Sequence, residues 1–481
     1  AIVSKVNDAP SESQELLTAS RDVIRARTLS ILRRFENDIE RKNSVIRFLA
    51  EAEIIGKLEL DLKGANLNGI DLKWADLRGA NLNSARLERA NLYDVKLQGA
   101  SLEGASLKKA NLNLASLEGT NTNLEGANLY MASLKRTNLK GDCLQKTNLN
   151  QTHLQESVLV DAHLEGAQLY EAHLEKADLR GAHLAGAWLE CANLKGANLK
   201  GANLERANLK EANLEGVNLE GANLEGANLE GAYLYKAHLE GASLKKARLF
   251  EAKLIYTHLR DANLEKANLG QADLRLANLE GAIVKGAYFA ETTLRDTNIV
   301  NNVLLKEANL TRAKLADFDL RETDLEGAIL KGANLMGANL ERANLKGANL
   351  QGATLQGAIL EGANLTGAHL EGAECHMGMF NPTDLRAANL IVTYLERAYL
   401  IGANFEGADL EEANLEGANL EEMAIPYTDE ISITNLKGAI LARIKFNKET
   451  SWPKRKVVFK AKSIPRELRL QLERSSKPRK K

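Results

Sequence analysis

The chain is dominated by a five-residue repeat, seen most clearly in the segment Ala197-Asn198-Leu199-Lys200-Gly201-Ala202-Asn203-Leu204-Glu205. From Leu62 to about Leu420 a leucine returns at every fifth position, usually preceded by Asn or Asp and, one residue earlier, by a small residue. An α-helix turns by about 100° per residue, so leucines five apart would not share one helix face. In a flat strand, an odd spacing sends successive leucines to opposite faces. A chain that turns by the same angle after every unit keeps all leucines on one axis, so the repeat predicts a solenoid.

Alternation within each unit places the leucine and the residue two before it inside the coil. That earlier residue is nearly always Ala, and otherwise mostly Ser, Thr, Val or Gly, which lets a narrow coil close. The Asn or Asp between them and the two residues after the leucine are expected to face outward.

The string Ala-[Asn/Asp]-Leu-x-x resembles the signature of the pentapeptide repeat family. The resemblance implies an all-β solenoid, a right-handed quadrilateral β-helix with four pentapeptides in each coil. Leucine positions at 62–117, 124–304 and 310–420 give 72 units, which at four per coil predicts about 18 coils. A thin Leu/Ala core exposes its first and last coils, so we expect a cap at each end.

The repeat has three interruptions. Residues 118–123 carry two extra residues, one extra residue separates Leu304 from Leu310, and the pattern lapses from Glu421 to Asn435. We therefore expect four parts. They are a disordered lead and helical cap (1–56), the repeat β-helix (57–420), irregular final coils with a C-terminal cap (421–453) and a basic tail (454–481).

The N-terminal part has helical signals. Ser11 followed by Gln14 is a capping box that predicts a helix start, and a second short helix is expected from about Ile39 to Gly56. The stretch from Arg25 to Leu49 resembles the helical segment that precedes the repeats in many cyanobacterial members of the family. It is interpreted either as an amphipathic cap over the first coil or as a docking or dimerising element.

The C-terminal part is harder to interpret. Weak units are centred on Leu436, Leu441 and Phe446, and Trp452 resembles the residue that covers the last coil in many pentapeptide domains. Beyond it, the leucines at 468, 470 and 472 alternate like a strand, whereas Ile464 and the leucines at 468 and 472 have helical spacing. The sequence leaves both alternatives open.

Charge is unevenly distributed along the chain. The net charge is −1, but residues 441–481 hold fifteen basic and three acidic side chains, a net +12, and residues 57–440 are net −13. The cysteines are far apart in sequence, at positions 143, 191 and 375, which is typical of a reducing compartment. No secretory signal and no apolar run of about 18–20 residues is visible, so a cytoplasmic location is expected.

The best site candidate is an outward apolar column. Ile359, Met379 and Tyr399 are twenty residues apart, at positions usually filled by Asn or Asp, and are expected to lie one coil apart in register. Nearby apolar residues are Ile391, Tyr394 and Ile401. Such a patch on a polar surface favours a protein interface or self-association; the alternative is tolerated surface substitution.

Catalytic and metal sites have weaker support. His153 and His173 should stack one coil apart, as should His163 and His183, and His238 and His258. These pairs are expected on three different faces, so no face gathers three ligands and surface ladders are favoured over a metal site. Cys375 should point inward and His376 outward, so they cannot form a nucleophile–base pair. We predict no enzyme activity, no cofactor, no metal and no small-molecule substrate.

The leading hypothesis is a non-enzymatic scaffold or linker that holds other proteins in a cyanobacterium-like cell. Some members of the family resemble duplex DNA and bind a topoisomerase, but here lysines such as Lys195, Lys200 and Lys210 interrupt the acidic field. A third alternative is tethering to nucleic acid or an anionic membrane surface through the basic tail. The tail residues singled out for this role are Lys454, Arg455, Lys456, Arg479, Lys480 and Lys481.

Overall fold

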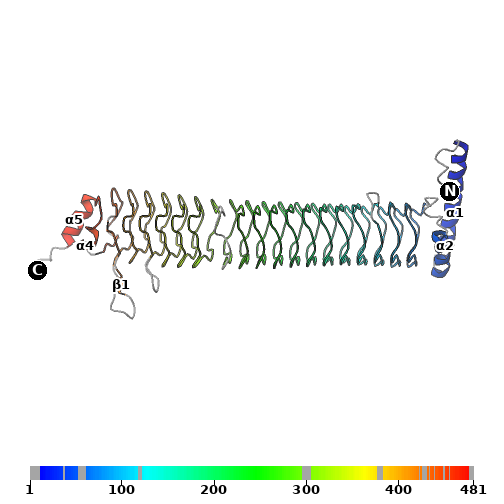
Figure 1. Ribbon diagram of the computed structural model, residues 1–481, viewed down its shortest axis with the longest axis horizontal. Coiled ribbons are helices and arrows are strands. Elements are labelled where there is room, and N and C mark those ends of the chain that lie inside the picture. The colour runs from blue at the N-terminus through cyan, green and yellow to red at the C-terminus, as the bar shows by residue number, and fades with distance from the viewer. Residues whose placement is uncertain are drawn as a thin grey trace. The chain divides into compact units, whose positions relative to one another are not determined.

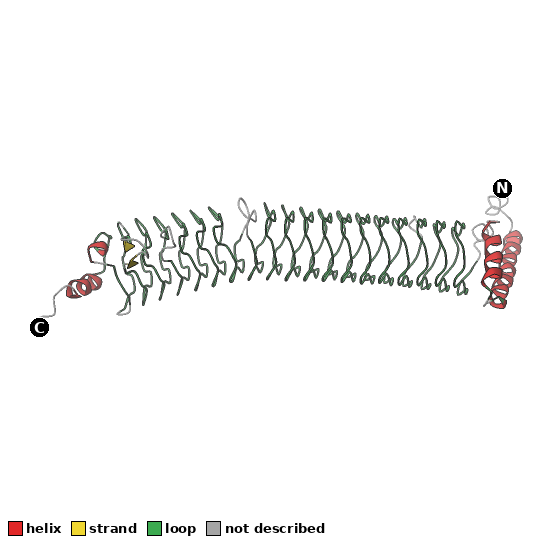
Figure 2. Cartoon of the chain, turned by 90° about the horizontal axis from the view of Figure 1, so that it is seen from below, coloured by secondary structure: helices red, strands yellow, loops and turns green. Residues whose placement is uncertain are grey.

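The computed structural model describes the backbone of the chain except at residues 1–10, 36–37, 52–60, 118–121, 295–304, 376–382, 422, 425–430, 433, 438, 448–449, 454 and 476–481. The chain forms two compact units, Ala1–Ser243 and Leu244–Lys481. Within each unit the backbone winds into stacked coils (Figures 1 and 2).

Each regular coil contains four five-residue units, as the resemblance implied. In unit 1, Asn198 forms parallel bridges with Asp178 and Asn218, twenty residues away on either side. The Leu199 amide donates to the Asn218 carbonyl at 2.6 Å. Leucine and alanine side chains fill the interior and are almost completely buried. Because each side of a coil contributes a single bridged residue between two turns, the coils are held by isolated bridges rather than by long strands.

The outward Asn explains why the corners turn so regularly. The Asn198 side-chain Oδ1 accepts a hydrogen bond from the Lys200 amide at 3.2 Å, which fixes the start of the corner. The second corner residue has a positive φ, 68° at Gly201 and 55° at Arg206. Glycine adopts this conformation without strain, which accounts for its frequency at the corners.

Two helices lie against the first coils of unit 1 (Figure 1). They are α1, Ser11–Arg34, and α2, Ile39–Glu51, so the predicted start at Ser11 is confirmed, while the predicted end at Gly56 lies outside the described residues. The Asp71 amide donates to Asn43 Oδ1 at 2.8 Å, and Arg25 Nη2 lies 2.8 Å from Asp61 Oδ2. These contacts support the capping interpretation; a docking or dimerising role stays a prediction.

Two of the predicted interruptions have the expected length. Ser101 pairs with Asn123, whereas a regular coil would join it to Asn121, so this coil has two extra residues. Tyr288 pairs with Asn309 instead of Ala308, so that coil has one extra residue.

However, the placement of the second interruption was wrong. Leu305, rather than Leu304, is the buried leucine that precedes the next corner. The extra residue therefore comes before Leu305, and Leu304 itself lies outside the described residues.

The structure has a further interruption that the leucine spacing does not reveal. Ile359 pairs with Asp384 and Glu374 pairs with Tyr399, so these coils contain one pentapeptide more than the usual four. The segment 376–382, which includes Phe380 at a leucine position, lies outside the described residues. An insertion of one whole pentapeptide preserves the leucine phase, so counting leucines could not detect it.

The lapse after Leu420 contains a small hairpin. Strand β1, Met423–Ala424, pairs antiparallel with β2, Ile431–Ser432. The coils then resume, because Asn404 pairs with Asn435 and Asp409 pairs with Ile440. In a regular register Asn404 would have paired with Ala424, so the hairpin lies within an enlarged coil.

The C-terminal segment completes unit 2. Phe446 packs edge-to-face on Trp452, with ring centroids 6.0 Å apart, and two helices follow, α4 (Arg455–Val458) and α5 (Arg466–Ser475). Ile464, Leu468 and Leu472 are buried, so the helical alternative for this segment is confirmed. Lys462 pairs with Ile440, which means that part of the predicted tail joins the coil ladder.

Candidate functional site

The predicted column of Ile359, Met379 and Tyr399 does not form. Ile359 lies between Asn339 and Asp384 in its column, whereas Tyr399 lies between Glu374 and Asn419 in another. Met379 lies outside the described residues. The prediction was wrong because it assumed four pentapeptides in a coil that contains five.

Two of the remaining candidates, Ile391 and Tyr394, lie close along one coil, together with Val392. Tyr394 is 38% exposed on its side of the coil, and Val392, at the preceding corner, is 41% exposed. Ile391 at the same corner is half-buried. The ring of Tyr394 stacks on that of His369 in the preceding coil, with centroids 4.6 Å apart and planes at 2°. We call His369, Ile391, Val392 and Tyr394 the Tyr394 patch.

The other candidates are separated from this patch by a charged corner. Tyr399 is 51% exposed but lies on the next side of the coil, with Ile401 half-buried at the corner beyond it. Glu396 and Arg397 form the corner between Tyr394 and Tyr399. The five predicted residues that the structure describes therefore occupy several sides of unit 2, and the contiguous patch is smaller than expected.

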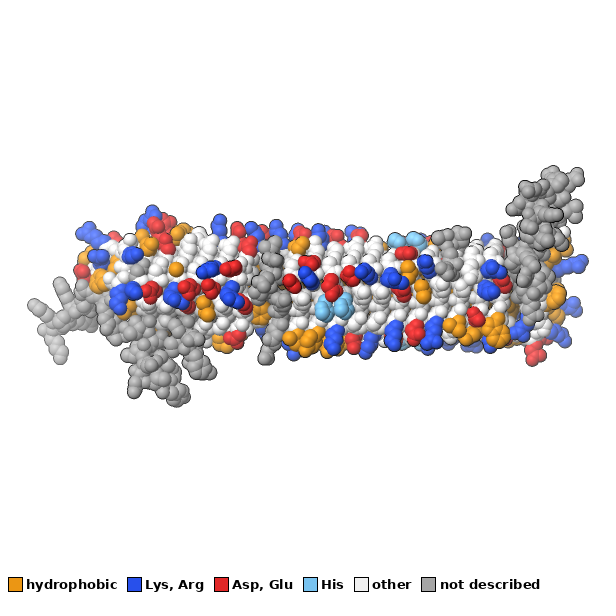
Figure 3. Space-filling view, viewed as in Figure 1, with side chains coloured by type: hydrophobic (Ala, Val, Ile, Leu, Met, Phe, Trp, Pro, Cys, Tyr) orange, Lys and Arg blue, Asp and Glu red, His pale blue; other side chains and the backbone are white. Residues whose placement is uncertain are grey.

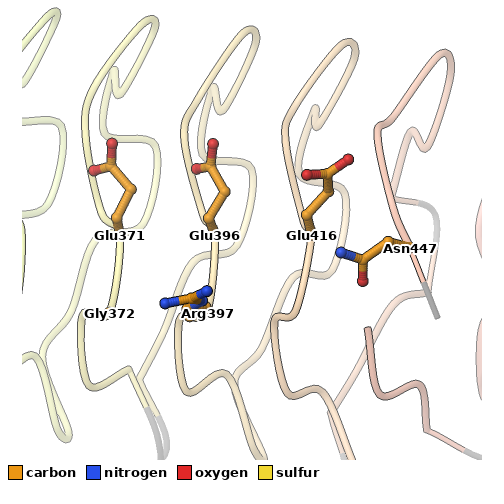
Figure 4. A pocket seen from close by; sticks show the side chains of 6 residues that line it. All are labelled: Glu371, Gly372, Glu396, Arg397, Glu416 and Asn447. Carbon is orange, nitrogen blue, oxygen red and sulfur yellow. The ribbon is translucent and has the colours of Figure 1, made fainter. Parts of the chain in front are cut away.

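An acidic groove runs beside the Tyr394 patch. Glu371, Glu396 and Glu416 follow one another on successive coils, and their side chains point the same way (Figure 4). The groove is also lined by Gly372, Arg397 and Asn447.

The groove is linked to the patch by short polar contacts. His369 Nδ1 lies 3.0 Å from Glu371 Oε1, and Asn414 Nδ2 donates to Glu396 Oε1 at 2.5 Å. Sequence reasoning missed His369 and these glutamates. The enlarged coil decides which residues lie beside them, and the leucine spacing does not reveal that coil. Once the register is known, each glutamate is found two residues after the outward position.

The basic tail is described only in part. Lys454, Arg479, Lys480 and Lys481 lie outside the described residues, and the backbones of Arg455 and Lys456 begin helix α4. In α5 the basic side chains of Arg466 and Arg469 are exposed, opposite the buried Leu468 and Leu472. Among the described residues, no helix has both the length and the apolar character that crossing a membrane requires.

The predicted orientations of the cysteines and histidines are confirmed where the structure describes them. Cys375 is buried, and burial raises the pKa of its thiol to about 12. Cys143 and Cys191 are half-buried on the outside, and all three cysteines are free. His153 stacks on His173 and His163 stacks on His183, with centroids 4.8 and 4.7 Å apart.

Four-sided coils with a Leu/Ala interior define a solenoid built from pentapeptides. A family model described as pentapeptide repeats (8 copies) matches more than half of the chain, and the chain belongs to the pentapeptide repeat family. The matched residues are 59–92, 85–121, 143–186, 177–216, 212–249, 242–281, 272–301, 304–342, 343–374 and 383–422.

Solved structures of the same family are similar to the chain. HetL, a pentapeptide repeat protein involved in heterocyst differentiation regulation from the cyanobacterium Nostoc sp. strain PCC 7120, is 32% identical; the match covers 59% of this chain and 89% of HetL, with a TM-score of 0.13. A pentapeptide repeat protein of the Arabidopsis thaliana thylakoid lumen is 32% identical over 24% of this chain and 72% of its own, with a TM-score of 0.14.

A third similar structure is QnrB1, a plasmid-mediated fluoroquinolone resistance protein. It is 14% identical over 50% of this chain and 97% of its own, with a TM-score of 0.18. A comparison with curated protein sequences gave no match.

Proposed function

We propose that the chain is a non-enzymatic scaffold that binds another protein through the Tyr394 patch and the acidic groove of unit 2. The observation that carries the proposal is the replacement of the usual outward Asn by aromatic residues. In one column, His369 and Tyr394 stand between Asn349 and Asn414. Tyrosine combines a large apolar ring with a polar hydroxyl, and it is enriched in the cores of protein interfaces.

The groove indicates the chemistry of the partner. Three glutamates on successive coils, with one arginine beside them, favour a segment that carries Lys or Arg next to an apolar anchor. The anchor would pack on Tyr394 and Val392, which are exposed, while the basic side chains would reach the carboxylates. Complementary charge of this kind mainly increases the association rate and the specificity.

A DNA-mimic function has less support. Lysines pair with glutamates of the next coil, as Lys195 Nζ does with Glu215 at 2.8 Å and Lys200 Nζ with Glu220 at 2.9 Å. Figure 3 shows basic and acidic side chains interspersed over the visible face of each unit. Such pairing prevents the continuous negative field that imitation of a phosphate backbone requires.

The proposal is tested by zero-length carbodiimide crosslinking in native extract, followed by mass spectrometry. This reagent joins carboxylates to lysines in direct contact. We expect crosslinked peptides that join Glu371, Glu396 or Glu416 to lysines of one recurring partner. Crosslinks distributed evenly over all outward glutamates, or none at the groove, would contradict the proposal.

Matched variants make the test specific. Val392→Asn with Tyr394→Asn restores residue types tolerated at the corner and the outward position, and is expected to remove the groove crosslinks. The control is Trp188→Asn with Tyr233→Asn, which removes exposed aromatic side chains from unit 1 and is expected to leave the crosslinks unchanged. Equal loss in both variants would indicate nonspecific apolar adhesion.

A further inference from the structure

His163, Glu165 and His183 bring three metal-ligating side chains together on unit 1, so the prediction that no face gathers three ligands was wrong. His163 and His183 occupy outward positions on consecutive coils and form a parallel bridge. Glu165 follows His163 by two residues, and His163 Nδ1 lies 3.5 Å from Glu165 Oε1. One potential ligand atom from each side chain lies within 4.8 Å of those of the other two.

The backbone beneath this cluster is held firmly. The Leu164 amide donates to the His183 carbonyl at 2.7 Å, and the His183 amide donates to the Ala162 carbonyl at 2.9 Å. Leu164 and Leu184 are buried beneath the histidines. Ligands on a rigid framework need little ordering when an ion binds, so only the side chains have to adjust.

The histidine pair on the opposite side of these coils differs in one informative way. His153 and His173 also stack, but there Glu175 follows the second histidine, and Asn193 on the next coil donates from Nδ2 to Glu175 Oε1 at 2.8 Å. In the pair His163 and His183, Glu165 follows the first histidine, and His183 occupies the place in the next coil that Asn193 occupies in the column on the opposite side. An imidazole therefore replaces the amide next to the carboxylate.

The surroundings of Glu165 favour a cation. Its Oε2 atom is buried and accepts no hydrogen bond from the described residues. The atom has lost water contacts on burial, and a bound cation would compensate for them. The ammonium group of Lys146 pairs with another carboxylate, that of Glu125, at 3.3 Å from Nζ. A carboxylate beside two imidazoles supplies negative charge that attracts a metal ion.

We propose that His163, Glu165 and His183 bind one divalent transition metal ion of the zinc class. Imidazole nitrogen and carboxylate oxygen are ordinary zinc ligands, with bonds of about 2.0–2.2 Å. The stacked rings must therefore draw together around the ion by side-chain rotation. Imidazoles select transition metals over Mg²⁺ and Ca²⁺. Three protein ligands leave one tetrahedral position for water or for a ligand from another molecule.

The test uses tag-free, full-length protein freed of metal by a chelator. Titration with Zn²⁺ is followed by isothermal calorimetry, and titration with Co²⁺ by its visible absorption, which intensifies strongly in tetrahedral sites. We expect His163→Asn with His183→Asn to bind one equivalent fewer than the natural chain, and Glu165→Gln to bind at that site at least tenfold more weakly. Asn is the common residue at both histidine positions, so the coils should be preserved, which circular dichroism will verify.

The matched control is His153→Asn with His173→Asn, which removes the stacked pair on the opposite side of the coils. This control variant should still bind the equivalent of metal ion that the His163/His183 variant loses. The proposal is overturned if the natural chain binds neither ion, if the His163/His183 variant retains the full stoichiometry, or if both double variants lose the same equivalent.

Discussion

Tyr394 stacks face-to-face on His369, with ring planes only 2° apart, although five pentapeptides rather than four separate them along the chain. In a regular coil of this protein the residue over His369 would be Asn389, twenty positions away. The stack therefore shows directly that one whole pentapeptide has been added to this coil. The same shift places Tyr399 over Glu374 rather than in the column of Ile359.

Replacing residues 376–382 by Lys-Gly should preserve the stacked coils. Bridges on both sides of this segment already join Ile359 to Asp384 and Glu374 to Tyr399, and a two-residue corner ending in glycine matches Gly372, whose φ is 66°. Shortening the connection from seven residues to two should stabilise unit 2 by about 1 kcal/mol through reduced loop entropy. Thermal unfolding followed by circular dichroism will measure this. A large loss of stability would mean that Phe380 fills the core and that the twenty-residue register is right.

The sequence predicts the coil because every unit repeats the same pattern of inward and corner residues. Leu199 and Ala202 fill the interior, and Asn198 fixes the corner, so the core follows from composition and spacing. The twenty-residue period was implied by the resemblance to the pentapeptide repeat family. The register of the coils on either side of an inserted pentapeptide cannot be predicted in this way, because a whole added unit leaves the five-residue spacing of the leucines unchanged. One signal was available in Pro382. Proline cannot adopt the positive φ of a second corner residue, so Asn381-Pro382 is incompatible with a regular corner.

The ends and the candidate sites were less predictable for a different reason. Leucines at 468, 470 and 472 have the period of a strand, whereas Ile464 and the leucines at 468 and 472 have that of a helix. The structure decides for the helix, α5, in which Leu468 and Leu472 are buried and Leu470 is exposed. The Tyr394 patch and the acidic groove depend on which coils are neighbours. Such relationships between distant residues are set by the register and not by any local pattern.

Asp178→Asn should lower stability slightly at neutral pH and not in acid. Hydrogen bonds from Arg180, at 2.8 Å from Nε and 2.7 Å from Nη2, lower the pKa of the Asp178 carboxyl. A lowered pKa in the folded state stabilises the protein above the unfolded-state pKa of about 3.9, and this contribution is lost as pH falls through the folded-state value.

The expected size of this effect is at most about 1 kcal/mol, because the pair is partly exposed. Asn keeps the acceptor for the Arg180 amide, so the corner itself should survive. Thermal unfolding of both proteins at pH 7 and at pH 2 will compare them, and the difference should disappear at the lower pH. A difference that grows in acid would show that the aspartate acts in another way.

Cys375 should resist alkylation in the folded chain. Burial raises the pKa of its thiol to about 12, so at pH 8 roughly one molecule in ten thousand carries the reactive thiolate. Cys143 and Cys191 also have raised pKa values, chiefly from burial, but they are only half-buried. Iodoacetamide labelling followed by mass spectrometry should therefore modify these two first. All three should react alike in denaturant. Native labelling of Cys375 at the rate of Cys191 would contradict its burial.

Asn43→Ala should loosen the helical cap from the first coils of unit 1. The Asn43 side chain accepts the Asp71 amide at 2.8 Å, which satisfies a backbone donor that otherwise faces the open end of the coils. Removing this acceptor should cost about 1–3 kcal/mol, the usual penalty for a poorly solvated donor left without a partner. Hydrogen exchange measured by mass spectrometry should then speed up in residues 61–80 and remain unchanged in residues 180–220. Ser44→Ala is the control, because Ser44 Oγ donates only within α2, to the Glu40 carbonyl at 2.9 Å, and is exposed. If both variants exchange like the natural chain, the helices do not depend on this contact, and the ion pair of Arg25 with Asp61 must hold the cap instead.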